Sequence, residues 1–255
     1  MIHPTAIIHP KAQVGANCQI GPYCVIGENV TLGENCKLHS HVVVDGHTVL
    51  GARNEFFPFA SIGLKTQDLK YKGGVTHLRI GDDNVFREGV TIHSATTDGD
   101  ATVVGSHNLL LTYVHIAHDC QLGNHIIMSG FVGLAGHVIV EDHAILGGYT
   151  AVHQFCRIGT FAMTGGCSRI PQDVTPYMIV EGNPAEARAV NKIGLERAGI
   201  SEAAQVALRT AHKIIFREGL MQAEALAKIE AELPALPEIK HLVQFIRAST
   251  RGICK

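Results

Sequence analysis

The sequence lacks several features that would place it in a specialised class of protein. It contains no uninterrupted run of 18 apolar residues, because its richest stretch, residues 125–140, is broken by histidines, glycines and a serine. No transmembrane helix is therefore expected. The first residues lack the basic-then-apolar order of a signal peptide. We expect a cytoplasmic protein without integral membrane association.

Charge and cysteine spacing exclude further classes. The net charge is −2 and 46% of the 255 residues are hydrophobic, so the chain is not disordered and can bury a sizeable core. Residues 1–185 hold 10 Lys and Arg against 15 Asp and Glu, whereas residues 186–255 hold 11 against 8. A basic surface for nucleic acid is absent. The seven cysteines form no C-x-x-C pair, which argues against a zinc ribbon or a dithiol redox centre.

A six-residue repeat runs through two thirds of the chain. Every sixth residue from Ile2 to Ile170 gives 29 positions, of which 25 are Ile, Leu, Val, Met or Phe. The composition alone predicts about 13. Glycine directly follows 11 of these apolar positions. Because one unit suffices only for a short strand and a corner, three units would form one coil, and stacked coils would form parallel β-sheets.

Small residues occupy a second phase of the repeat, two positions before the apolar residue. Five of the seven cysteines fall in this phase: Cys18, Cys24, Cys36, Cys120 and Cys156. We interpret them as small core residues and not as disulfide partners. Three asparagines follow an apolar residue by three positions and suit corners in the left-handed backbone region: Asn17, Asn29 and Asn35.

The repeat is interrupted twice and then stops. Residues 64–79 and 94–102 are polar, and we expect both to be loops that leave the coil and carry function. After about residue 184 glycine becomes rare and helical spacing begins. Ser201 should cap one helix and Pro237 should open another. The sequence thus predicts a β-helix over residues 1–185 and a helical domain over residues 186–255 that covers its open end.

Sixteen histidines are unusually many, and the repeat aligns several of them. Positions separated by three repeat units should lie above one another on neighbouring strands, about 4.8 Å apart. His118, Gly136 and Gln154 form such a file, and His137 and His153 lie one residue from it. Proton transfer by a histidine is the use of this file that we favour. Zinc binding by imidazoles on adjacent coils remains an alternative.

A second file with the same spacing consists of His107, His125 and His143. These residues fall at predicted corners, and we expect exposed turn residues there.

The repeat resembles that of the hexapeptide-repeat acyltransferases, which implies an all-β, left-handed parallel β-helix with a C-terminal α-helical domain. Longer stretches are similar to the UDP-N-acetylglucosamine O-acyltransferases of lipid A synthesis, and they occupy residues 67–71, 115–120, 134–137, 147–148, 151–155 and 249–252. Because the similarity covers nearly the whole chain, the protein is identified as a member of this family.

The resemblance implies an acyltransferase that passes an (R)-3-hydroxyacyl group from acyl carrier protein to the 3-hydroxyl of UDP-N-acetylglucosamine. His118 matches the family's general base, Asp119 would fix its tautomer, and the N–H of Gly136 matches the donor to the oxyanion. No cofactor, metal or covalent intermediate is implied. Family members are homotrimers with sites between subunits, so we expect a homotrimer.

The resemblance also implies which residues contact the substrates. In the first loop the matching residues are Gln67, Asp68 and Lys70. A wider set of matching residues consists of His93, His115, His137, His153 and Gln154. Asn191 and Arg197 match the residues at the diphosphate and uridine end, although Ile193 and Ala198 depart from the family pattern there. Gly166 matches the residue that ends the acyl groove.

Five cations near the start of the helical domain would suit the acidic carrier protein, namely Arg188, Lys192, Arg209, Lys213 and Arg217. Three other functions remain as alternatives. The related N-acyltransferase carries an extra N-terminal domain, whereas the repeat here starts at Ile2. A γ-class carbonic anhydrase would contain zinc, and a purely structural β-solenoid would show no turnover. The length of the acyl chain, and a 3-hydroxyl or a 3-amino group on the acceptor, are also open.

Overall fold

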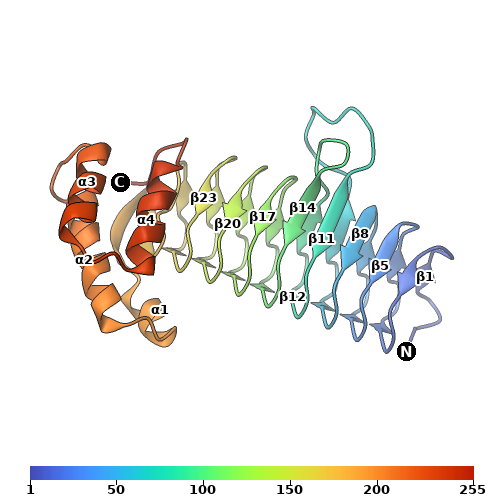
Figure 1. Cartoon of the computed structure of the whole chain (residues 1–255). Coiled ribbons are helices and arrows are strands. Elements are labelled where there is room, and N and C mark those ends of the chain that lie inside the picture. Colours follow the sequence, from blue (N-terminus) through green and yellow to red (C-terminus); the bar gives the residue numbers. More distant parts are fainter.

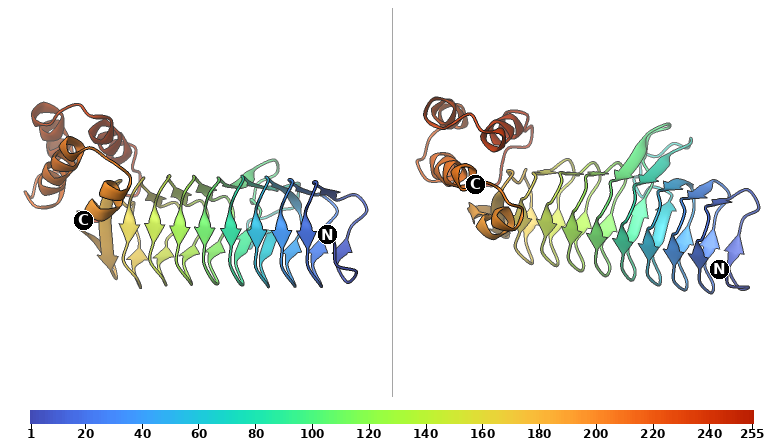
Figure 2. Two further views of the ribbon diagram at one scale, coloured as in Figure 1. Left: turned by 90° about the horizontal axis from the view of Figure 1, so that it is seen from below. Right: turned by 60° about the horizontal axis from the view of Figure 1, so that its bottom comes forward.

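The computed structural model describes all 255 residues and shows a long parallel β-helix followed by four helices (Figure 1). The N-terminus lies at one end of the β-helix, and the helices lie at the other end. Three parallel sheets form the sides of the β-helix, which therefore has the shape of a three-sided prism. Two views from other directions show the strands stacked along the axis of this prism (Figure 2).

Each coil contributes one short strand to each sheet. The first sheet contains β1 (Ile7–Ile8), β4 (Val25–Ile26), β7 (Val43–Val44), β10 (Ser61–Leu64), β13 (Thr91–His93), β16 (His115–Ile116), β19 (Gly133–Leu134), β22 (Ala151–Val152) and β25 (Arg169–Ile170). The second sheet contains β2 (Gln13–Val14), β5 (Val30–Leu32), β8 (His47–Leu50), β11 (His77–Ile80), β14 (Ala101–Val104), β17 (Gln121–Leu122), β20 (Ile139–Val140) and β23 (Arg157–Ile158).

The third sheet has ten strands. They are β3 (Gln19–Ile20), β6 (Lys37–Leu38), β9 (Glu55–Phe56), β12 (Val85–Phe86), β15 (Leu109–Leu110), β18 (Ile127–Met128), β21 (Ile145–Leu146), β24 (Met163–Thr164), β26 (Met178–Gly182) and β27 (Ala185–Val190). The last two strands form an antiparallel hairpin, whereas all other pairs are parallel.

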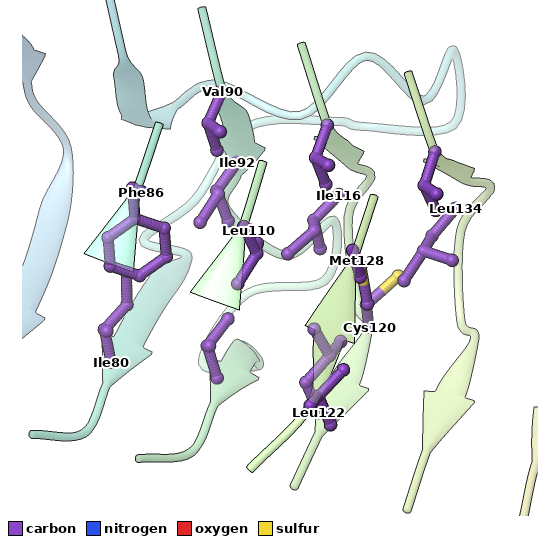
Figure 3. Packing of buried hydrophobic residues seen from close by; sticks show 14 of the residues in the cluster. Ile80, Phe86, Val90, Ile92, Leu110, Ile116, Cys120, Leu122, Met128 and Leu134 are labelled. Carbon is purple, nitrogen blue, oxygen red and sulfur yellow. The ribbon is translucent and has the colours of Figure 1, made fainter. Parts of the chain in front are cut away.

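Each two-residue strand points one side chain outward and one inward, and a corner follows it. One strand and one corner take six residues, so the inward apolar residue recurs at every sixth position. Where no loop intervenes, each strand pairs with the strand three repeat units further on, as in Ile127 opposite Ile145. The inward residues belong to one core of 43 buried residues. Figure 3 shows its files of stacked side chains, such as Ile92, Ile116 and Leu134 on the first sheet. The predicted coil of three repeat units is confirmed.

The cysteines of the second phase are buried, as predicted. All five line the core, and every cysteine in the chain is a free thiol. The corner asparagines are only partly as expected. Asn17 and Asn35 have φ angles of 59° and 58°, but Asn29 is not in the left-handed region. That prediction is wrong because β5 begins one residue later, at Val30, so Asn29 leads directly into an extended strand.

Both loops leave the prism at the corner between the first and second sheets, on successive coils (Figure 1). They are shorter than predicted, residues 65–76 and 94–100, because the strands beside them are longer: β10 continues to Leu64, and β11 begins at His77. The loops hold each other, since the Val75 N–H donates to Oδ1 of Asp98 at 2.7 Å, and the hydroxyls of Thr66 and Thr96 are 2.9 Å apart.

The helical domain contains α1 (Lys192–Arg197), α2 (Glu202–Phe216), α3 (Gln222–Glu232) and α4 (Pro237–Arg247). Ser201 caps α2 by accepting from the Ala204 N–H at 3.2 Å, and Pro237 opens α4, both as predicted. The domain boundary predicted after residue 185 falls at the start of β27, and the first helix begins at Lys192. None of these helices combines the length and the apolar character needed to span a bilayer.

Thiol titration distinguishes one cysteine from the other six. Cys167 is exposed, whereas burial raises the pKa of the Cys120 thiol to about 12 and that of Cys156 to about 11. Because only the thiolate reacts with a disulfide reagent, we expect no more than one rapidly reacting thiol in the native protein and seven after unfolding. Cys167→Ser should abolish the rapid phase, and a rapid phase that survives this substitution would contradict the fold.

Candidate active site

The file of candidate residues lies at the corner between the first and second sheets. His118, Gly136 and Gln154 follow β16, β19 and β22, each two positions after the strand ends. Asp119, His137 and Phe155, the residues after them, all have positive φ angles of 61–65°. The repeated corner therefore presents the same position three times, one coil apart.

His118 is held by a carboxylate that is itself fixed from two sides. Its Nδ1 donates to Oδ2 of Asp119 at 2.7 Å, and the Asp119 side chain is only 8% exposed. Oδ1 of Asp119 accepts from the Thr96 N–H at 3.1 Å, and the Asp119 N–H donates to Thr102 Oγ1 at 2.8 Å. An ionised Asp119 requires the proton on Nδ1, so the lone pair of His118 lies on Nε2.

The first loop brings a second carboxylate to the open side of His118. Oδ2 of Asp68 is 3.9 Å from Nε2 of His118. The other oxygen, Oδ1, accepts from the Lys70 N–H at 2.9 Å, and the Asp68 N–H donates to Thr66 Oγ1 at 3.1 Å. These bonds fix the turn, so that Asp68 presents one oxygen to His118.

Close packing, and not the φ angle, requires a glycine at position 136. A Cβ atom there would overlap the ring of His118, which lies against the Gly136 backbone. The N–H of Gly136 donates to no acceptor in the chain. The site therefore combines a held imidazole with a free N–H one coil away.

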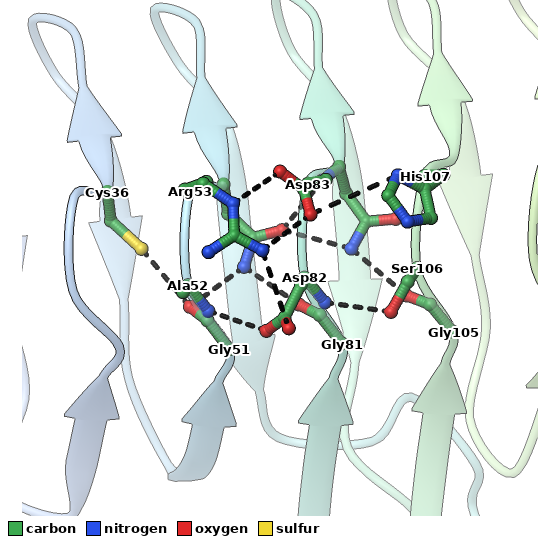
Figure 4. Close-up of polar contacts among 12 residues, drawn as sticks. Cys36, Gly51, Ala52, Arg53, Gly81, Asp82, Asp83, Gly105, Ser106 and His107 are labelled. Atoms are coloured by element: carbon green, nitrogen blue, oxygen red, sulfur yellow. Dashed lines mark hydrogen bonds and ion pairs between the residues drawn. The ribbon is translucent and has the colours of Figure 1, made fainter.

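The free N–H of Gly136 is notable because the N–H at the equivalent position of the neighbouring corner is hydrogen-bonded. Between the second and third sheets, this N–H donates to a side chain of the next coil: Ala52 to Asp82 at 2.7 Å, and Asp82 to Ser106 at 2.9 Å (Figure 4). Ser106 and Asn124 continue the series. The corner that contains Gly136 lacks such acceptors, so its N–H is available to a bound molecule.

His137 extends the site along the prism. Its Nε2 is 3.6 Å from Oδ2 of Asp119, its ring is nearly perpendicular to that of His118, and it stacks on Phe155 with centroids 4.6 Å apart. A recess of about 340 Å³ opens between His137 and the two loops. Its lining is polar: Asp68, Lys70, Lys72, Gly73, Thr96, Thr97, Asp98 and His137. Charged and hydroxyl-rich molecules suit such a recess.

His93 and His115 lie on the first sheet with ring centroids 5.3 Å apart. Nδ1 of His115 is 2.7 Å from Oγ1 of Thr91, whereas the buried Nδ1 of His93 has no partner. Burial lowers the pKa of both imidazoles, and a charge on His118 lowers both further. Both are therefore neutral at pH 7 and can donate or accept a hydrogen bond there.

A single chain does not bring the remaining candidates to His118. Asn191 uses its side chain within the fold, accepting from Gly194 and donating to the carbonyl oxygen of Phe161. Phe161 belongs to the corner between the second and third sheets. Arg197, at the end of α1, is exposed and has no ion-pair partner. The structure thus separates Asn191 and Arg197 from the candidate residues around His118.

The other candidates lie in accessible positions. Gln67 is exposed in the first loop. His153 and Gln154 are exposed, and Nδ1 of His153 lies 3.1 Å from the carbonyl oxygen of Gln154. The file of His107, His125 and His143 is exposed, as predicted, and its rings also stack, with centroids 4.9 and 4.8 Å apart.

Four glycines could take a Cβ atom without a severe clash inside the chain and without a strained φ angle. Of the 27 glycines, all others have a positive φ or would place a Cβ within 3.0 Å of another atom. The exceptions are Gly130, Gly133, Gly148 and Gly166. Three of them recur once per coil, at the corner between the third and first sheets, on the coils that carry the His118 file. A molecule outside the chain that approaches this surface closely would account for them.

Sequence reasoning missed the threonines that support the site. Thr91, Thr96 and Thr102 bond to His115 or Asp119 from other coils or from the second loop. The sequence gives no signal for these contacts, because only the stacking of coils and the docking of the loop create them.

Two family profiles match the chain. "Udp N-acetylglucosamine O-acyltransferase; Domain 2" matches residues 173–254, and "Bacterial transferase hexapeptide (six repeats)" matches residues 1–33 and 11–46. The chain is also similar to curated acyl-[acyl-carrier-protein]–UDP-N-acetylglucosamine O-acyltransferases. That of Pseudomonas syringae pv. tomato is 46% identical over 79% of both chains, and that of Stutzerimonas stutzeri is 47% identical over 82% of this chain and 81% of the relative.

Solved structures agree along the whole chain. LpxA from Acinetobacter baumannii has a TM-score of 0.96 at 48% identity, covering 100% of this chain and 99% of that one. LpxA from Bacteroides fragilis 9343, a UDP-N-acetylglucosamine acyltransferase, has a TM-score of 0.97 at 42% identity and covers 100% of both. The predicted fold class, a left-handed parallel β-helix with C-terminal helices, is confirmed.

The tautomer of His118 depends on Asp119. We expect imidazole ¹⁵N NMR to place the proton of neutral His118 on Nδ1, and Asp119→Asn to lose this preference, because an amide can also donate to Nδ1. Asp83→Asn is a matched control, since Asp83 faces His107 at the neighbouring corner. An unchanged His118 tautomer in Asp119→Asn would show that Asp119 does not set it.

Proposed function

The chain belongs to the UDP-N-acetylglucosamine O-acyltransferase family, and we propose that it passes an (R)-3-hydroxyacyl group from acyl carrier protein to the 3-hydroxyl of UDP-N-acetylglucosamine. This reaction is the first step of lipid A biosynthesis. The observation that carries the proposed mechanism is the His118–Asp119 pair, which lies beside the free N–H of Gly136.

His118 acts as the general base. A neutral hydroxyl is a weak nucleophile, so Nε2 takes its proton while the sugar oxygen attacks the thioester carbon. Asp119, 2.7 Å from Nδ1, stabilises the imidazolium that forms. When the C–S bond breaks, the proton passes from His118 to the departing thiolate of the carrier protein. No covalent enzyme intermediate or cofactor is needed.

Gly136 supplies the donor for the developing oxyanion. Its N–H is unpaired within the chain, and the absence of a side chain lets both His118 and the reacting carbonyl approach. A fixed donor aimed at the oxyanion is worth about 10²–10³ in rate in other acyl-transfer enzymes.

The polar recess beside the loops holds the sugar nucleotide. Oδ2 of Asp68 accepts from a sugar hydroxyl, and Lys70 offers its ammonium to a phosphate, with Gln67 beside them. His137 lines the same recess. The neutral imidazoles of His93 and His115, together with His153 and Gln154, complete the polar contacts.

The complete site lies between subunits of a homotrimer. Asn191 and Arg197, assigned to the nucleotide end, do not lie near His118 in one chain, so we assign this end of the site to a neighbouring copy, in which Asn191 caps the helix that ends at Arg197. Apolar exposure supports such contacts: Leu69 at the tip of the first loop is fully exposed, and Phe131 and Tyr149 are 48% and 63% exposed. A second copy of the chain would cover them.

The acyl chain lies along the glycine file. Gly130, Gly148 and Gly166 leave a strip without side chains over three coils, and Gly166 marks its far end. The carrier protein docks on β27 and the helices after it, where five cations are exposed: Arg188, Lys192, Arg209, Lys213 and Arg217. Two of them, Arg188 and Lys192, also pair with Glu186 and Glu196. Acidic carrier proteins complement this charge. The free thiols of all seven cysteines are typical of a cytoplasmic protein.

Removal of the base tests the mechanism. His118→Ala should lose about 10²-fold or more of its acyl transfer to UDP-N-acetylglucosamine, because general bases typically contribute this much. His125→Ala, at an exposed corner, is the matched control and should keep its activity. Both variants should sediment as trimers, like the wild type. Full activity in His118→Ala would overturn the mechanism, and no wild-type activity with any 3-hydroxyacyl carrier protein would overturn the function.

A side chain in the glycine file should shorten the acyl group that is used. Gly166→Met should fold normally, since a Cβ there meets only the carbonyl oxygen of Gly148 at 3.5 Å. It should prefer a shorter chain than the wild type, and Gly148→Met, one coil nearer His118, a shorter chain still. Assays with a panel of acyl carrier proteins measure this order. Unchanged profiles in both variants would exclude the strip as the acyl groove.

A further inference from the structure

The proposed base belongs to a cluster that can bind a cation. Asp68, His118 and His137 each offer one ligand atom, and these atoms all lie within 4.8 Å of one another. They come from the first loop and from two successive coils. This is a property of the folded chain, since Asp68 lies far from both histidines in the sequence.

The donor set and its spacing suit zinc. Two imidazoles and one carboxylate, with a position left for water, form a common ligand set for Zn²⁺. Bonds of about 2.1 Å in a tetrahedral centre separate neighbouring ligand atoms by about 3.4 Å. The 3.9 Å between Nε2 of His118 and Oδ2 of Asp68 is too long for a hydrogen bond and close to this separation.

The ligands are also oriented in advance. Nδ1 of His118 donates to Asp119, the arrangement in which a carboxylate holds a metal-binding imidazole in its tautomer. Oδ1 of Asp68 is engaged by the Lys70 N–H, so Oδ2 is the free oxygen. His137 is held by stacking on Phe155. The polar recess of about 340 Å³ that Asp68 and His137 line gives an ion access from solvent.

We propose that Asp68, His118 and His137 bind one Zn²⁺ or a similar divalent transition-metal cation, which inhibits acyl transfer by coordinating Nε2 of His118. The cation and the transferred proton compete for the same lone pair, so the metal acts as an inhibitor and not as a cofactor. The inhibition rests on the proposed function, whereas the binding does not.

The other histidine cluster is a matched control. His107, His125 and His143 stack with their ring planes within 5° of parallel. The lone pairs of stacked imidazoles lie in parallel planes and do not converge on one point, so this file does not form a tetrahedral site. His125 and His137 both have positive φ angles, 56° and 61°, which asparagine tolerates. The same substitution can therefore be made at both positions.

Cobalt binding tests the site without reference to activity. Addition of Co²⁺ to the wild type should produce the visible absorption of a tetrahedral centre, saturating at one ion per chain. His137→Asn and Asp68→Asn should each weaken binding by ~10-fold or more, and Asp119→Asn, outside the ligand set, by ~10–100-fold. His125→Asn should bind like the wild type. No saturable spectrum, or a loss only in His125→Asn, would overturn the site.

Acyl-transfer assays test the consequence. Zn²⁺ should inhibit the wild type and His125→Asn at concentrations that match the binding curve, and EDTA should restore full activity. If Co²⁺ and Zn²⁺ bind as expected but leave turnover unchanged, the proposal that the metal inhibits acyl transfer is wrong. No turnover either with or without metal would refute the proposed function alone, because the cobalt spectrum reports the site independently, whereas turnover that requires metal would refute the inhibition.

Discussion

The narrow interior of the three-sided prism is the constraint on which the rest of the structure depends. Each two-residue strand points only one side chain into it, and the 43 buried residues of the core fill it completely enough that even Phe56 and Phe86 are fully buried and stack at 4.7 Å. Close packing of this kind permits little change in volume. Each uninterrupted coil must therefore return after three repeat units, and this spacing places chemically related residues above one another.

The site is a local exception to the regular corner. At the neighbouring corner, side-chain oxygens such as Oδ1 of Asp142 satisfy the exposed N–H of the preceding coil. At the corner of the site, the side chain of Gln154 does not accept from the Gly136 N–H, which stays free, and the missing side chain of Gly136 makes room for the His118 ring. Both long loops leave the prism at this corner, and their contacts fix Asp68 and Asp119. The rigid β-helix thus positions groups that isolated loops would hold loosely.

One lone pair explains both the proposed reactivity of the site and its proposed sensitivity to metals. Asp119 keeps the proton on Nδ1 of His118 and thereby directs Nε2 toward the loop. An atom that accepts a proton from a hydroxyl also accepts a transition-metal cation when further ligands lie nearby. Asp68 and His137 are the proposed substrate contacts, and their closeness to His118 also makes them suitable ligands. The proposed proton transfer and the proposed inhibition therefore depend on the same atom, Nε2 of His118.

The sequence by itself determined the coil, the core and the file of His118, Gly136 and Gln154, because a repeat that fills a narrow interior is visible in the residues alone. It also indicated both loops, the cap of α2 and the proline that opens α4. Only the tertiary structure decided that Thr96 and Thr102 hold Asp119, that Asp68 faces Nε2 of His118, and that Asn191 is occupied in capping α1. It also showed that four glycines have space for a Cβ atom inside the chain. These facts depend on how loops fold back and on which space stays empty, and neither leaves a periodic signal in the sequence.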